Sequence, residues 1–145
     1  MFRVRIQIAH PPQVVFAHLA DVENAPLWYE AVRRVDNPSG RPVALGAHVT
    51  FHREIGGRPL ANCVEIAEFV PNACICFQSR EGPTPFTYRY VLRPADGGTE
   101  LTLEGEISGD GLPGPAALLG PLASQFFERG MRTNLEALRR WIEAP

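Results

Sequence analysis

Several signals that define large classes of protein are missing from this chain. No apolar run approaches the roughly 20 residues that a helix needs to cross a bilayer. Residues 1–9 alternate charged and hydrophobic side chains, unlike the continuous apolar stretch of a signal peptide. The chain has only 14 basic residues, no basic block and a formal net charge of −2. We therefore predict a cytoplasmic protein without a membrane span, and nucleic acid is not an expected partner.

Cysteine is scarce, and the spacing of a metal site is absent. An odd number of cysteines (Cys63, Cys74 and Cys76) in a chain without a signal peptide argues against a disulfide framework. Cys74 and Cys76 would share one face of a strand, but no second pair and no matching histidine spacing accompany them. We predict small buried or half-buried cysteines, no metal site and no cofactor.

Motifs of several common enzyme classes are also missing. There is no glycine-rich loop that could hold a phosphate, and no serine lies in a G-x-S-x-G nucleophile elbow. These absences disfavour the usual hydrolase, kinase and dehydrogenase mechanisms.

Strand patterns fill most of the chain between residues 41 and 107. Alternation of apolar and polar residues predicts strands over residues 2–8, 46–55, 58–69, 73–80, 86–92 and 99–107, and another that begins around Val32 and Val35. Short turns such as Gly56-Gly57 join the late strands, so we expect an antiparallel meander. Two short helices follow the first strand, one over residues 12–20 and one capped by Asn24 that carries Trp28 and Tyr29.

Residues 115–143 have the periodicity of one long amphipathic helix. Apolar residues recur there at three- and four-residue steps: Leu119, Leu122, Phe126, Phe127, Met131, Leu135, Leu138, Trp141 and Ile142. Such a face must be buried, and the sheet is the large surface available to cover it. A curved sheet against a long helix tends to leave a cavity, which predicts a binding pocket. Gly120-Pro121 interrupts the stripe, so we expect a kink or a broken first turn there.

The order of these elements resembles the START-like, or Bet v 1-like, helix-grip fold of the polyketide cyclase/dehydrase and lipid-transport superfamily. The resemblance is carried by the strand that ends at His10-Pro11-Pro12, by Val15, Phe16 and Leu19, by residues 21–28 with Val32 and Val35, and by residues 64–71, 97–103 and 134–140. It implies one α+β domain over residues 1–145, in which about seven antiparallel strands wrap a long C-terminal helix. This fold hosts cyclases, lipid and hormone carriers and quinone-binding chaperones, so it does not by itself define a function.

Arg53 is the charged residue whose predicted position is most informative. If Val49 and Phe51 face the helix, strict alternation turns Arg53 to the same side. A buried guanidinium needs a carboxylate partner or an anionic or carbonyl ligand. The resemblance favours a ligand, since aromatase/cyclase relatives are thought to orient a polyketide with a pocket arginine. A salt bridge to a neighbouring strand, with Glu65 as one candidate, and an outward position near the strand end are the alternatives.

Aromatic residues supply the other candidate pocket residues. Tyr88 and Tyr90 share the apolar face of their strand and would present hydroxyls to a flat ligand, or else belong to an ordinary core. Trp28 would cap the ligand or, as we favour, anchor its helix. Other candidate lining residues are Phe51, Phe77, Phe126, Phe127 and Met131. His48 and His52 fall on the opposite face of their strand from Phe51, and we expect them to be solvated.

Together these patterns predict a protein that binds a small hydrophobic molecule, either aromatic, polyketide-like or lipid. If it is an enzyme, cyclisation or dehydration of a poly-β-ketone is the expected reaction. Arg53 would then stabilise an enolate, and Tyr88 or Tyr90 would transfer a proton. A non-catalytic lipid or quinone carrier and an interaction module with a filled cavity are the alternatives. The sequence does not indicate an oligomeric state.

Overall fold

A computed structural model describes residues 1–40 and 42–145. Residue 41, where the predicted strand-rich region begins, lies outside the described residues. The elements follow one another as β1 (Phe2–Ile8), α1 (Pro12–Ala20), η1 (Val22–Leu27), β2 (Val32–Asp36), β3 (His48–Ile55), β4 (Arg58–Val70), β5 (Cys74–Glu81), β6 (Phe86–Ala95), β7 (Gly98–Ile107), η2 (Gly114–Leu122) and α2 (Ala123–Glu143).

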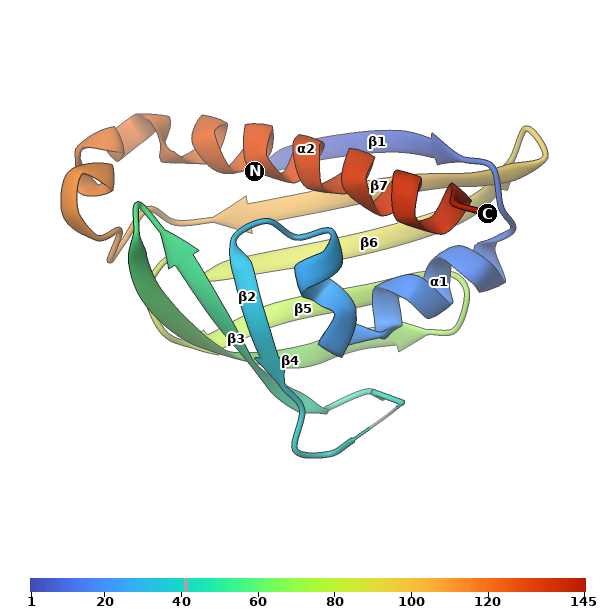
Figure 1. The fold of residues 1–145 in the computed structure, drawn as a ribbon, viewed down its shortest axis with the longest axis horizontal. Coiled ribbons are helices and arrows are strands. Elements are labelled where there is room, and N and C mark those ends of the chain that lie inside the picture. Colours follow the sequence, from blue (N-terminus) through green and yellow to red (C-terminus); the bar gives the residue numbers. More distant parts are fainter. Residues whose placement is uncertain (41) are drawn as a thin grey trace.

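The strands form one curved antiparallel sheet in the order β1-β7-β6-β5-β4-β3-β2. From β2 to β7 each strand pairs with the next one along the chain, and β1 closes the far edge against β7. The long helix α2 lies across the concave face on the side of β1 and β7, and α1 and η1 follow it on the same face (Figure 1). This is the predicted helix-grip architecture, with strand bounds within three residues of those expected.

Alternation along the strands determines which side chains reach the core. In β3, Val49, Phe51, Arg53 and Ile55 are buried, whereas the residues between them are more exposed. In β6 the buried positions are Phe86, Tyr88, Tyr90 and Leu92. The helix α2 meets them with residues at three- and four-residue intervals: Ala123, Phe127, Met131, Asn134, Leu135, Leu138 and Ile142. The core therefore lies between the concave sheet and one face of α2.

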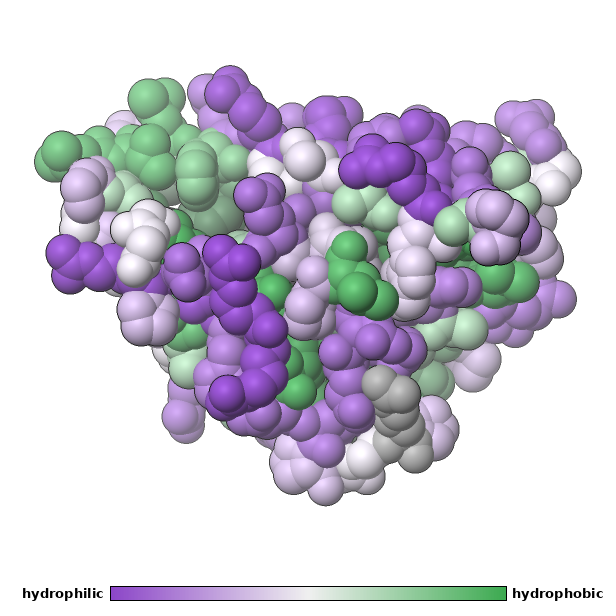
Figure 2. All heavy atoms as spheres, viewed as in Figure 1, coloured by the Kyte–Doolittle hydropathy of each residue, from purple (hydrophilic) through white to green (hydrophobic). Residues whose placement is uncertain are grey.

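The predicted long helix is broken, as its Gly-Pro step indicated, but the break removes more than one turn. Residues Gly114–Leu122 form the 3₁₀ segment η2 ahead of α2, and this segment is itself kinked at Gly120, whose φ of 49° and ψ of −120° lie outside the helical region. Leu122 and Phe126 remain 55% and 46% exposed, so the prediction that both belong to the buried face is wrong. Apolar side chains gather on the surface over η2 and the start of α2, at the upper left of Figure 2.

The second short helix also differs from expectation. It is a 3₁₀ helix that ends at Leu27, so Trp28 and Tyr29 follow it and do not belong to it. The backbone N–H groups of both residues donate to the Ala25 carbonyl, at 3.1 and 2.8 Å. This tight turn carries both rings into the core, where each is nearly fully buried.

Shortening a buried side chain of α2 should destabilise the fold much more than shortening an exposed side chain of η2. Leu138 is fully buried, so Leu138→Ala should lower the free energy of unfolding by about 2–5 kcal/mol. Leu122→Ala, the same substitution at an exposed position, should change it by less than about 0.5 kcal/mol. Urea denaturation of both variants checks this, and equal losses would mean that η2 is packed as tightly as α2.

Candidate functional site

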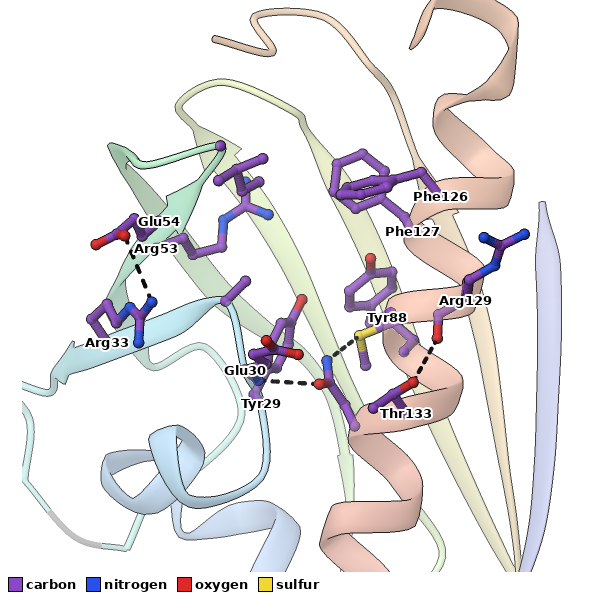
Figure 3. Close-up of a pocket in the computed structure, with 16 residues that line it drawn as sticks. Tyr29, Glu30, Arg33, Arg53, Glu54, Tyr88, Phe126, Phe127, Arg129 and Thr133 are labelled. Carbon is purple, nitrogen blue, oxygen red and sulfur yellow. Dashed lines mark hydrogen bonds and ion pairs between the residues drawn. The ribbon is translucent and has the colours of Figure 1, made fainter. Parts of the chain in front are cut away.

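A cavity of about 430 Å³ opens between the β3–β4 hairpin and the N-terminal half of α2. It is open to solvent on one side, and side chains from β3, α2 and the segment after η1 converge on it (Figure 3). Its lining consists of Tyr29, Glu30, Ala31, Arg33, Arg53, Glu54, Ile55, Gly56, Tyr88, Phe126, Phe127, Arg129, Gly130, Met131, Thr133 and Asn134.

The lining separates into a buried floor and an exposed rim. The floor consists of the buried residues: Tyr29, Arg53, Ile55, Tyr88, Phe127, Met131 and Asn134. The rim carries charged side chains, of which Arg33 and Glu54 form an ion pair at 3.6 Å, and it includes the half-exposed ring of Phe126. Hydrogen-bonding groups therefore lie at the bottom of the cavity, among apolar walls.

Arg53 lies on this floor and is only 2% exposed. Its Nε donates to Asn62 Oδ1 at 2.9 Å, and its Nη2 donates to the Pro83 carbonyl at 3.2 Å and to the Thr84 hydroxyl. The guanidinium also lies over the Phe86 ring, with Cζ 5.3 Å from the ring centroid. The alternation along β3 predicted this inward position, whereas the role of Arg53 toward a ligand remains a prediction.

The partners of Arg53 are all neutral. Among the residues described, no carboxylate lies within ion-pair distance of it, and Glu65, the candidate suggested by the sequence, binds Arg80 instead at 2.8 Å. A guanidinium has five N–H donors. Nε and Nη2 supply the three hydrogen bonds described above, and the Tyr29 hydroxyl, which is also neutral, is the other hydrogen-bonding side chain that interacts with the guanidinium in the described structure. A buried cation in this state favours an anionic or carbonyl oxygen beside it.

Thr84, which accepts a hydrogen bond from Arg53, has a strained backbone conformation. Its φ of 50° lies in the left-handed region, which β-branched residues rarely adopt. It is fully buried, its N–H donates to the Asp110 carbonyl at 2.6 Å, and its hydroxyl accepts from Arg53. Strained residues of this kind persist where surrounding contacts demand them, often at functional sites.

Tyr29 and Tyr88 add hydroxyls to the floor beside Arg53. Both rings lie near Arg53 in Figure 3, and the Tyr88 hydroxyl points toward the space between Arg53 and Phe127. Burial raises the pKa of Tyr29 and raises that of Tyr88 well above the ordinary value of 10.0, although the Arg53 charge opposes both shifts. The Tyr29 hydroxyl interacts with both Arg53 and the Tyr88 hydroxyl, and the buried Tyr88 hydroxyl has no other hydrogen-bond partner in the described part of the chain. Both tyrosines are therefore protonated donors at neutral pH.

Asn134 is a floor residue that the sequence analysis did not select. Its Oδ1 accepts the backbone N–H of Glu30 at 3.1 Å, which fixes the orientation of the amide. Its Nδ2 then points to the sulfur of Met131 at 3.3 Å, and a thioether is a weak acceptor. The sequence did hold a signal for it, because Asn134 is a polar residue within the apolar stripe of α2. After Arg53 and Tyr88, Asn134 is thus a third residue whose donor could bind a ligand in the cavity.

The remaining candidate residues fall into two groups. Phe126, Phe127 and Met131 line the open cavity, as do Arg53 and Tyr88. Tyr90, Trp28, Phe51 and Phe77 instead surround a separate void of only about 10 Å³. Trp28 and Tyr90 meet edge to face at 6.3 Å, and the anchoring role that we favoured for Trp28 stays a prediction.

His48, His52 and the three cysteines lie on the opposite face of the sheet. His48 is exposed, and His52 Nε2 lies 2.7 Å from an Asp36 carboxylate oxygen at the surface. Burial, helped by Glu68 for Cys74, raises the pKa of Cys74 and Cys76 to about 11, so both remain thiols. In the described residues, no group of three His, Cys, Asp or Glu side chains converges as metal ligands would.

Over residues 1–143 the sequence matches the family described as polyketide cyclase / dehydrase and lipid transport. The chain belongs to this family. None of the curated proteins matches it. Helices of the described residues all lack the combination of length and hydropathy that a membrane crossing requires.

Solved structures share the fold at low sequence identity. A protein from Thermus thermophilus superposes with a TM-score of 0.80 at 19% identity, over 98% of this chain and 96% of that one. The Zhui aromatase/cyclase of a Streptomyces species gives 0.77 at 18%, over 98% and 92%. A START superfamily protein from Mycobacterium smegmatis gives 0.72 at 17%, over 98% and 96%. At these identities the likeness establishes the helix-grip fold.

The buried tyrosines should resist ionisation. The chain has three tyrosines, and burial is the main cause that raises the pKa of each above 10.0. A raised folded-state pKa means that the stabilisation is complete below pH 10 and is lost as the pH rises toward the folded value. Absorbance titration should therefore show each tyrosine less than half ionised in the folded protein at pH 10, and all three should ionise together on alkaline unfolding. Half-ionisation of one tyrosine at pH 10 in folded protein would contradict this.

Proposed function

We propose that this protein binds a small, mostly apolar molecule that carries a carbonyl, enolate or carboxylate oxygen, with that oxygen against Arg53. The observation that carries the proposal is a buried guanidinium that lines the cavity and whose partners in the described structure are all neutral. Phe127 and Met131 provide the apolar contact that such a pocket needs. An aromatic or polyketide-like ligand matches this combination, and family membership supports it.

The donors of the floor suit one chemical task in particular. Arg53 carries a positive charge, and Tyr29 and Tyr88 are protonated, so all three favour negative charge on an oxygen between them. Enolisation of a β-dicarbonyl develops such a charge. In a cyclisation or dehydration of a poly-β-ketone, Arg53 would hold the enolate oxygen. The carbon-bound proton lost on enolisation would pass to water in the open cavity, and a floor tyrosine, which its raised pKa keeps protonated at neutral pH, would serve as the proton donor.

A non-catalytic lipid or quinone carrier is the second candidate. It is favoured by the absence of any carboxylate or histidine from the buried floor, as far as the described residues show. The two carboxylates of the lining, Glu30 and Glu54, belong to the exposed rim, and Glu54 is paired with Arg33. A carrier needs a shaped cavity and a fixed donor, but it needs no base.

Benzoylacetone is a suitable probe for the proposed site, because it joins a phenyl ring to a β-diketone and its enolate absorbs at longer wavelength than its neutral enol. The wild-type protein should bind it and lower the pKa of the bound diketone by about one to two units, the size expected of a charge-assisted hydrogen bond. Absorbance titrations at several pH values give both the affinity and the shift.

Arg53→Leu should abolish that shift and weaken binding about tenfold or more. We expect the variant to fold, since removing a buried charge offsets the hydrogen bonds lost by Asn62 and Thr84. Arg132→Leu removes an exposed arginine outside the cavity and is the matched control, with no expected effect. Unchanged binding and an unchanged shift in the folded Arg53→Leu protein would refute the assignment.

Native mass spectrometry of the protein purified from its own host separates the two candidates. A carrier should retain a discrete lipid or quinone, which denaturing extraction would identify. An enzyme that releases its product should give the mass of the protein alone. A lipid or quinone bound in wild type and retained by Arg53→Leu would favour a carrier in which Arg53 has no part.

A further inference from the structure

The cavity ends at two tyrosines. Of the described residues, Tyr29 and Tyr88 are the two that line both the open cavity and the small void behind it. Their side chains therefore form the wall between the two spaces. The void behind them, of about 10 Å³, has room for no more than one water molecule.

Aromatic packing holds this wall in place from behind. Tyr29 meets Trp28 at 5.7 Å and Phe51 at 6.5 Å between ring centroids, and Tyr88 meets Phe86 at 4.9 Å. Both tyrosines are buried, so neither ring has room to move backward, away from the cavity. The cavity is closed at its inner end, and a ligand enters and leaves between α2 and the β3–β4 hairpin.

Donors with only neutral or weak protein partners concentrate at that inner end. They are the Arg53 guanidinium, the Tyr88 hydroxyl beside that of Tyr29, and the Asn134 amide, whose acceptor is only the Met131 sulfur. Toward solvent the lining changes to the half-exposed ring of Phe126 and to charged, exposed rim residues, of which Arg33 and Glu54 are paired with each other.

We infer that a ligand binds with its oxygen-bearing end innermost, against the wall formed by Tyr29 and Tyr88, and with its apolar end at the mouth beside Phe126. This orientation rests on the proposed function. It makes Tyr29 and Tyr88 specificity-determining residues: they limit the size of the group beside the ligand oxygens, whereas the far end of the ligand extends toward solvent and tolerates added bulk. The corresponding ligand class is a compact β-dicarbonyl or aryl ketone head with an unrestricted tail.

Two analogues of benzoylacetone test the orientation on the wild-type protein. One carries a tert-butyl group on the para position of the phenyl ring, at the far end. The other carries tert-butyl in place of the acetyl methyl, beside the oxygens. The first should bind within about threefold of benzoylacetone, and the second should bind about tenfold more weakly or worse, because overpacking a closed site is costly.

Tyr88→Leu should restore binding of the second analogue, because the smaller side chain opens the wall toward the void. Phe126→Leu is the matched control at the mouth and should not restore it. Equal losses for the two analogues, or a loss confined to the para-substituted one, would overturn the inferred orientation. The analogue measurements need no variant, so misfolding of Tyr88→Leu would not spoil the test. Failure of benzoylacetone itself to bind would instead count against the proposed function.

Discussion

The need to satisfy a buried guanidinium organises this end of the molecule. Arg53 is only 2% exposed, so its donors require acceptors inside the protein, in the cavity or in a ligand. Asn62 on β4 and the backbone and hydroxyl of residues 83 and 84 supply neutral acceptors, and Thr84 adopts a left-handed conformation in doing so. Neutral acceptors position the charge without cancelling it. The remaining positive charge is therefore available to a ligand.

The break in the helix leaves the cavity beside Arg53 open to a ligand. If the helix had begun at residue 115, as the periodicity suggested, its apolar stripe would have continued along the sheet. The conformation of Gly120 instead directs Leu118 and Leu122 to the surface, and α2 begins at Ala123. Phe126 consequently stands half exposed at the rim, and the cavity stays open between α2 and the β3–β4 hairpin. The kink at Gly120 thus accounts for an accessible pocket where a continuous helix would have given a filled core.

Strand alternation was sufficient to place most of the candidate residues. A period of two positioned Arg53 with Phe51, and Tyr88 with Tyr90, on the concave face, and it placed His48 and His52 outside. It was not sufficient to distinguish pocket from core. Tyr88 lines the open cavity whereas Tyr90, two residues later on the same face, lines the inner void, because sheet curvature and the path of α2 determine how far each side chain lies from solvent.

The sequence by itself determined the order of elements, the antiparallel meander and the side of the sheet on which each residue lies, because these depend on local periodicity and turn chemistry. Only the tertiary structure decided which groups meet. Asn134 became a donor of the floor because Glu30, more than a hundred positions earlier in the chain, takes its oxygen. Arg53 binds amide and hydroxyl oxygens, whereas the sequence analysis had suggested Glu65 as a candidate partner. Such pairings depend on strand register and helix position, and no local pattern encodes them.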